Sequence, residues 1–334
     1  MNKKCEKSAA IEIRLAVYAV YSSYTLMVIA GLVNFEIWKQ ILDLWEENIS
    51  PDRLSLLAPH ALRYSIIWPI LQIATIINWP ADRVFSYIVA LLVIATARTV
   101  EGTRAKILNE KYRHQYPKLM IAIIFPVISL FMNGRLVFSF LGIAILVDAL
   151  ISWDLKLRGS ITTLLRVTIA FWLTSVSTGT FGVAVSSVAL WAITVATRIF
   201  RRSNLRNLMM VAAVLISFFA ISPLVSAYAI KNINYYGGGL EGVYNMLGHG
   251  PGAYLKWLGP VGIALAGMFI SPLVLLLLQW TATRGPTIAP QICVIASAIS
   301  IGIFGYSTLL AMVPAVVLQL SIRSTLFRKV SAAP

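Results

Sequence analysis

The stretch from Thr162 to Thr197 reads TTLLRVTIAFWLTSVSTGTFGVAVSSVALWAITVAT and contains one charged residue, Arg166. An apolar helix of about 20 residues crosses the roughly 30 Å hydrocarbon core of a membrane. This stretch has 36 residues, too many for one crossing and just enough for two. Its middle, SVSTGTFG, holds small and hydroxylated residues that suit a sharp turn. The stretch therefore predicts two membrane-spanning helices joined by a tight turn, with Arg166 as an anchor at the inner membrane surface.

The whole chain shares this apolar character. Of its 334 residues, 58% are hydrophobic and 12% are charged, whereas about a quarter of the residues of a soluble domain are charged. Because so few charges cannot cover a water-exposed surface, we expect an all-α polytopic integral membrane protein. It should form a single transmembrane domain over residues 1–334, with about 10–11 transmembrane helices. The apolar segments lie at 13–34, 63–79, 83–98, 117–133, 136–153, 162–177, 180–197, 207–230, 257–280, 286–304 and 306–322.

Basic loops orient this domain. Lysine and arginine are concentrated in residues 98–118, in residues 198–206 and in the C-terminal tail, which predicts that these segments face the cytoplasm. The net charge of +15 then reflects loops beside anionic lipid, and we expect no nucleic-acid partner. From residue 117 onward, alternate crossings place four connections on the outer side, namely 133–135, 178–180, 229–256 and 304–306.

Before residue 98 the alternation fails, because a cytoplasmic N-terminus and three crossings would put the basic 98–118 loop outside. One early segment is therefore re-entrant or interfacial, or the N-terminus lies outside; we favour an inside N-terminus and a first outer loop at 35–62. Within that loop, FEIWKQILDLWEENI has its apolar residues at helical spacing. It predicts an amphipathic helix near 36–50 on the membrane surface, with its tryptophans at headgroup level.

The outer loops and helix ends carry polar side chains that suit a lipid-linked phospho-sugar. Arginine forks match phosphate oxygens, tyrosine offers a sugar a flat face and a hydroxyl, and histidine can accept a proton near neutral pH. Two cysteines without a CxxC motif give no thiolate metal site. The candidate residues are Arg135 and His249 for catalysis, and Arg63, Lys256, Tyr254, Tyr244, Glu241, Ser177, His60 and Arg53 for substrate binding.

The order of these features resembles that of Wzy-type O-antigen polymerases, which belong with EpsG-like and GT-C-like membrane glycosyltransferases. NGRLVFSFLGIAIL (133–146) is similar to their helix that starts with an outward-facing arginine. LTSVSTGTFGVAVSSVALW (173–191) resembles their paired helices with a small-residue turn. NMLGHGPGAYLKWLGPVGIALAGMF (245–269) is similar to the end of their large outer loop, and ISPDRLSLLAPHALRYSIIWPIL (49–71) to the loop after their first helix.

The resemblance implies a polysaccharide polymerase in the bacterial inner membrane with its active site facing the periplasm. Such an enzyme joins undecaprenyl-pyrophosphate-linked oligosaccharide repeat units without a metal, nucleotide or other cofactor, and a chain-length regulator protein is an expected partner. Arg135 would hold the departing pyrophosphate, with Arg63 and Lys256 as further phosphate partners. His249 would be the candidate base on the acceptor hydroxyl. The chain departs from larger relatives in its short 229–256 loop, where Glu241 is the acidic residue.

Three alternatives stay open. A metal-dependent GT-C glycosyltransferase would use acidic residues of the first outer loop, for which Asp43, Glu46 and Glu47 could stand. An O-antigen ligase shares much of the architecture and differs in its acceptor. A polysaccharide flippase or other transporter would show charges buried in the middle of helices and an inverted repeat. Here most apolar segments lack such charges, with Arg166 as the nearest exception.

Overall fold

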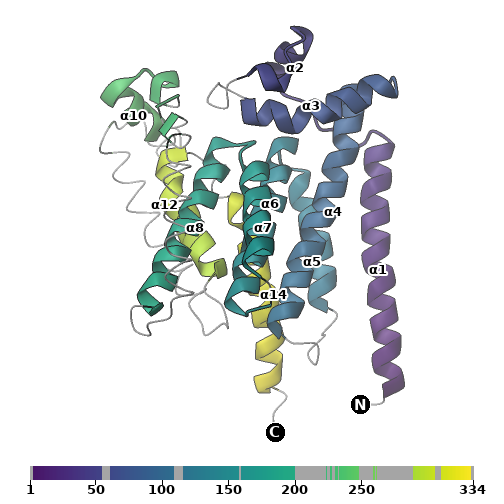
Figure 1. Ribbon diagram of the computed structural model, residues 1–334. Coiled ribbons are helices and arrows are strands. Elements are labelled where there is room, and N and C mark those ends of the chain that lie inside the picture. Colours follow the sequence, from purple (N-terminus) through teal and green to yellow (C-terminus); the bar gives the residue numbers. More distant parts are fainter. Residues whose placement is uncertain are drawn as a thin grey trace.

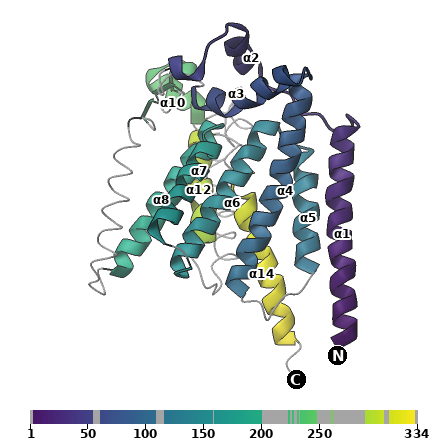
Figure 2. The same ribbon diagram turned by 45° about the vertical axis from the view of Figure 1, so that its right-hand side comes forward.

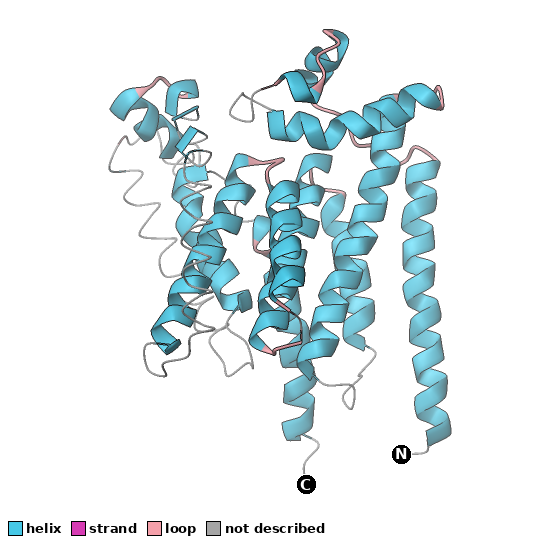
Figure 3. Ribbon diagram, in the orientation of Figure 1, coloured by secondary structure: helices cyan, strands magenta, loops and turns pink. Residues whose placement is uncertain are grey.

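The computed structural model describes residues 3–54, 61–108, 116–157, 159–199, 233–247, 289–304 and 310–331, together with 223, 226–227, 230–231, 259 and 261. Every regular element among these residues is a helix (Figure 3). The expected all-α fold is therefore confirmed for this part of the chain. The predicted segments 207–230 and 257–280 lie almost entirely outside the described residues.

Among the described residues, eight upright helices form a bundle, and further elements lie at one end (Figure 1). The upright helices are α1 (Lys3–Ile29), α4 (Ala81–Leu108), α5 (Tyr116–Ser129), α6 (Gly134–Asp154), α7 (Ser160–Thr174), α8 (Thr178–Ile199), α12 (Ala289–Phe304) and α14 (Val313–Ser331). The elements at that end are α2 (Lys39–Glu46), η1 (Pro51–Arg53), α3 (Ala61–Ile76) and α10 (Gly239–Leu247). We call the end with α2, α3 and α10 the upper end, and the end with the first turn of α1 and the last turn of α14 the lower end.

α6 is the centre of the bundle, and most of its side chains are buried. It packs against α4, α7, α8, α12 and α14. Against α4, the rings of Phe138 and Phe85 stack with their centroids 6.0 Å apart. Against α7 the backbones meet closely, because a Cβ on Gly142 would lie 2.9 Å from the carbonyl oxygen of Ala170. A glycine at this point of α6 thus allows α6 and α7 to touch.

α3 differs from the spanning segment predicted at 63–79 and agrees with the alternative that one early segment does not cross. It lies across the upper ends of the upright helices instead of running among them (Figure 2). Tyr64 ties it to the segment after α2, because its hydroxyl donates to the carbonyl of Ile49 at 2.6 Å. With α3 lying across, the first turn of α1 and the last turn of α4 both fall at the lower end.

α2 confirms the amphipathic helix expected near 36–50. The helix is shorter, and its apolar face packs on protein, with Ile41 fully buried. Trp38, just before α2, packs edge-on against Phe85 with ring centroids 6.3 Å apart. The connector before it is fixed to the first turn of α4, where the backbone N–H of Ile37 donates to Asp82 at 2.9 Å. Trp38 therefore faces the bundle.

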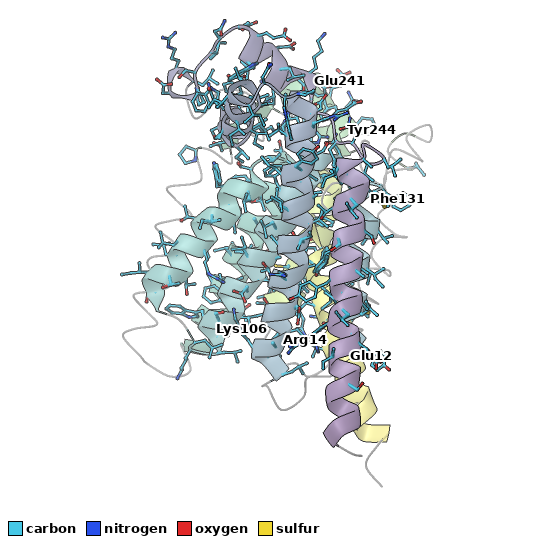
Figure 4. All side chains as sticks on the ribbon, turned by 90° about the vertical axis from the view of Figure 1, so that its right-hand side faces the viewer. Glu12, Arg14, Lys106, Phe131, Glu241 and Tyr244 are labelled. Atoms are coloured by element: carbon cyan, nitrogen blue, oxygen red, sulfur yellow. The ribbon has the colours of Figure 1, made fainter. Side chains whose placement is uncertain are left out.

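Two helices of the described part, α4 and α6, are long and apolar enough to cross a membrane by length and composition. Five shorter apolar stretches, in α3, α5, α7, α8 and α14, accompany them. The predicted segments from 83 onward agree with helices where they are described, although α4 continues ten residues beyond the predicted end at 98. The turn of 130–133, between α5 and α6, lies at the upper end, and there Phe131 is 85% exposed (Figure 4).

Candidate functional site

The turn between α7 and α8 lies at the upper end and is buried despite its position. Its hydroxyl groups are used within the protein. The Thr180 hydroxyl lies 2.9 Å from the carbonyl oxygen of Thr174 and 3.0 Å from that of Ser177. It also lies 2.7 Å from the hydroxyl of Ser139 on α6. The small and hydroxylated residues of SVSTGT thus form a compact turn that is bonded to α6.

Arg63 lies above this turn, in the first turn of α3. Its Nη2 donates to the hydroxyl of Thr178, the first residue of α8, at 2.8 Å. A hydrogen bond to a neutral hydroxyl does not neutralise the positive charge of a guanidinium, because the acceptor carries no negative charge. The helix that lies across the upper end therefore brings a cation to the α7–α8 turn.

Arg135 lies at the start of α6. It is the second residue of that helix, and its backbone N–H donates to the side chain of Asn133, the N-cap, at 3.2 Å. It precedes by one helical turn Ser139, the residue of α6 that contacts Thr180. Its Nε is buried and has no hydrogen-bond partner among the described residues. A buried unpaired donor is costly, and an acceptor from outside the protein would remove that cost.

Lys231 adds a third cation. Burial and, to a lesser degree, the positive charge of nearby Arg63 lower the pKa of Lys231 from its ordinary value to about 8. Across the described residues, no carboxylate forms an ion pair with Lys231 or Arg135. We call Arg63, Arg135 and Lys231 the upper cation group. Lys231 and Arg63 lie near enough to repel each other, so an anion bound beside them would be favoured.

The other predicted site residues are placed as follows. Ser177 lies in the α7–α8 turn, where its carbonyl accepts from the N–H of Phe181 at 2.9 Å. Glu241 and Tyr244 lie on α10 at the upper end (Figure 4). Glu241 is exposed, and the Tyr244 hydroxyl would lie 3.6 Å from a Cβ on Gly259. Arg53 ends η1 and is exposed, outside the contacts of the upper cation group. His249, His60, Lys256 and Tyr254 lie outside the described residues.

A second charged cluster lies in the lower half of the bundle and was not predicted. Its centre is Asp148 of α6, whose side chain is 3% exposed. Oδ1 accepts from Thr103 of α4 at 2.8 Å and from Nζ of Lys106. Oδ2 accepts from Nη1 of Arg166 on α7. Arg166 is therefore not a solitary surface anchor, as its sequence position suggested, but a partner of Asp148.

The signal for this cluster was present in the sequence. Asp148 is the one carboxylate in the apolar run FLGIAILVDALISW, and Arg166 is the one cation in the next run. Isolated opposite charges in neighbouring apolar helices are strongly favoured to pair, because each is costly alone in a low-dielectric interior. Asp148 thus joins Arg166 as an exception to the expectation that most apolar segments lack such charges.

No group of three or more histidine, cysteine, aspartate or glutamate side chains that could hold a metal ion is found in the described part of the chain. Asp43, Glu46 and Glu47, the acids considered for a metal, are exposed on and just after α2. Comparison of the chain with protein-family models, with curated proteins and with solved structures gave no match.

Proposed function

We propose that the bundle is an integral membrane domain with its upper end on the periplasmic side of a bacterial inner membrane. Two helices of sufficient length and apolarity support this. So do large apolar side chains that are exposed in rows along the bundle, since soluble proteins rarely expose such patches. On α1 these are Ile11, Leu15, Tyr18, Leu26 and Ile29, and on α7 they are Ile161, Leu164, Leu165, Ile169 and Trp172.

We further propose that the protein is a polysaccharide polymerase that joins undecaprenyl-pyrophosphate-linked repeat units. The upper cation group is the observation that carries this proposal. Arg63 at the α7–α8 turn, Lys231 near Arg63, and Arg135 at the start of α6 offer three cations at one end of the bundle for a diphosphate. The polyprenyl chain of the substrate stays in the membrane beside the lipid-facing surface of the bundle, while its diphosphate reaches the upper cation group.

The reaction needs a leaving-group site and a base. An acceptor hydroxyl oxygen attacks the anomeric carbon of the growing chain, and the bond from that carbon to the pyrophosphate oxygen breaks. The pyrophosphate leaves with the bonding electron pair, and Arg135 and Arg63 stabilise its negative charge. The hydroxyl proton passes to a base, for which His249 remains the candidate.

Reconstitution of the purified protein with undecaprenyl-pyrophosphate-linked repeat units, in EDTA and without nucleotide sugar, tests this function. We expect a ladder of longer lipid-linked saccharides. Arg135→Gln and Arg63→Gln should each lower the rate at least about tenfold, because each removes a charge-assisted hydrogen bond to the leaving group. Arg83→Gln is the matched control, since Arg83 is an exposed arginine at the upper end of α4. Absence of a ladder, or equal losses in all three variants, would contradict the proposal.

One observation favours a flippase or another transporter as the second candidate. Asp148, Lys106 and Arg166 are ionisable groups within the bundle, and transporters use such groups in ion and proton pathways. The same vesicles distinguish the two functions. A transporter moves the fluorescently labelled lipid-linked saccharide between leaflets and leaves its length unchanged, whereas a polymerase lengthens it.

A further inference from the structure

The lower charged cluster carries more positive than negative charge. It consists of Lys106, Asp148 and Arg166, with the hydroxyls of Thr103 and Ser152. One carboxylate faces two cations, so one positive charge is left over. The carboxylate is buried, whereas the side chains of Lys106 and Arg166 are 26% and 30% exposed. The excess charge therefore lies at the surface of the bundle.

Most hydrogen-bond donors of the two cations have no partner within the described part of the chain. An arginine has five N–H donors and a lysine has three. Within the described residues, Arg166 donates to Asp148, and Lys106 donates to Asp148 and to the Ser152 hydroxyl at 3.3 Å. Neither cation has a buried unpaired nitrogen. Because both side chains are partly exposed, donors without a partner among the described residues are open to an acceptor beside the bundle.

The position of the cluster indicates which acceptors these are. Asp148 lies six residues before the end of α6 and Arg166 six residues after the start of α7, about 9 Å from the lower helix ends at 1.5 Å per residue. Beside Arg166, Leu164 and Leu165 are 61% and 59% exposed. In a membrane these leucines face acyl chains, and few waters reach the donors at this depth.

We propose that Lys106 and Arg166 form a binding site for the phosphate of an anionic phospholipid of the inner leaflet, with Asp148 holding both cations in place. The phosphodiester oxygens accept from the free donors of the two side chains and compensate the excess charge. The acyl chains lie along the apolar face of α7. The proposal rests on the membrane placement given above and is independent of the polymerase activity.

Thermal unfolding of the full-length protein in detergent tests this site, at a fixed scan rate and with three separate additions: phosphatidylglycerol, phosphatidylcholine and sodium phosphate. A ligand that binds the folded protein raises its unfolding temperature. We expect phosphatidylglycerol to raise it most. Arg166→Gln and Lys106→Gln should each weaken the apparent affinity at least about tenfold, and each leaves Asp148 with one cation.

Arg14→Gln is the matched control, because Arg14 is an exposed cation of α1 that also lies in the lower half of the bundle (Figure 4). It should bind phosphatidylglycerol like the unchanged protein. Equal effects of phosphatidylcholine would refute a charge-specific site, and equal effects of sodium phosphate would show a free-phosphate site instead. An equal loss of phosphatidylglycerol affinity in Arg14→Gln would show a general attraction between basic side chains and anionic lipid instead of a specific site.

If Arg166→Gln does not fold, Lys106→Gln decides the question, and unaltered affinity in a folded variant overturns the proposal. The polymerase assay is scored separately. A protein that makes a ladder without binding phosphatidylglycerol refutes the lipid site alone, and one that binds the lipid without making a ladder refutes the polymerase alone.

Discussion

The contact between α6 and α7 gives a sharp test of the fold through two glycines. Gly142 lies inside α6 against α7, and Gly102 lies inside α4 with nothing within 4 Å of the position of an added Cβ. Replacement of either by alanine removes backbone freedom from the unfolded chain and favours the helix by about 1 kcal/mol. The two variants share this gain and differ in packing alone.

The packing cost at Gly142 follows from three distances. An added Cβ would lie 2.8 Å from Cγ2 of Thr174, 2.9 Å from the carbonyl oxygen of Ala170 and 3.1 Å from Cβ of Leu173. Carbon atoms are in optimal contact at about 3.5–4.0 Å. The Ala170 oxygen cannot move alone, because it belongs to helical backbone and also accepts from the Thr174 hydroxyl at 2.8 Å. α6 and α7 would therefore have to separate.

Such overpacking costs about 1–3 kcal/mol. Gly142→Ala should therefore be less stable than Gly102→Ala by about that amount, and Gly102→Ala should be more stable than the unchanged protein by up to about 1 kcal/mol. Because Arg135 and the α7–α8 turn lie at the upper ends of these two helices, Gly142→Ala should also weaken anion binding there.

The assay is the apparent midpoint of thermal unfolding in one detergent at one scan rate, since unfolding of such proteins is often irreversible. Intrinsic tryptophan fluorescence or loss of the monodisperse peak in size-exclusion chromatography reports it. If Gly142→Ala is as stable as Gly102→Ala, the α6–α7 contact is not as close as described and the reasoning fails.

Two further predictions concern the charged groups. Asp148→Asn should lower stability by about 3–5 kcal/mol, because it leaves two cations without their carboxylate partner. The triple variant Asp148→Leu, Lys106→Met, Arg166→Met should recover most of that loss. A triple variant as unstable as Asp148→Asn in the same thermal assay would contradict this prediction. For Lys231, whose pKa burial lowers to about 8, a bound anion favours the charged form, so binding takes up a proton above pH 8. The affinity for inorganic pyrophosphate, measured by calorimetry, should therefore fall as pH rises through about 8. Lys231→Arg should remove most of that pH dependence, because arginine stays charged. An unaltered pH profile in this variant would exclude Lys231 from the site.

The sequence predicted the helices well because apolar length and composition are local properties. The hairpin of 162–197 is an example: α7 and α8 meet in the small-residue turn that SVSTGTFG indicated. The amphipathic pattern after Phe35 likewise gave the helix α2. Of the residues predicted for the outer side, Ser177 lies in the α7–α8 turn, Arg63 contacts that turn, and Arg135 begins α6 at the same end of the bundle.

The sequence could not fix which way an apolar helix runs or which side chain meets which. Whether the 16 residues of α3 cross the bundle or lie across its end depends on the surfaces that α2, α4 and α7 offer, and these come from distant parts of the chain. In the same way, Asp148 lies 42 residues from Lys106 and 18 from Arg166. Hydropathy indicates that burying each charge is costly. The ion pairs that offset this cost form only when α4, α6 and α7 pack together in the folded bundle.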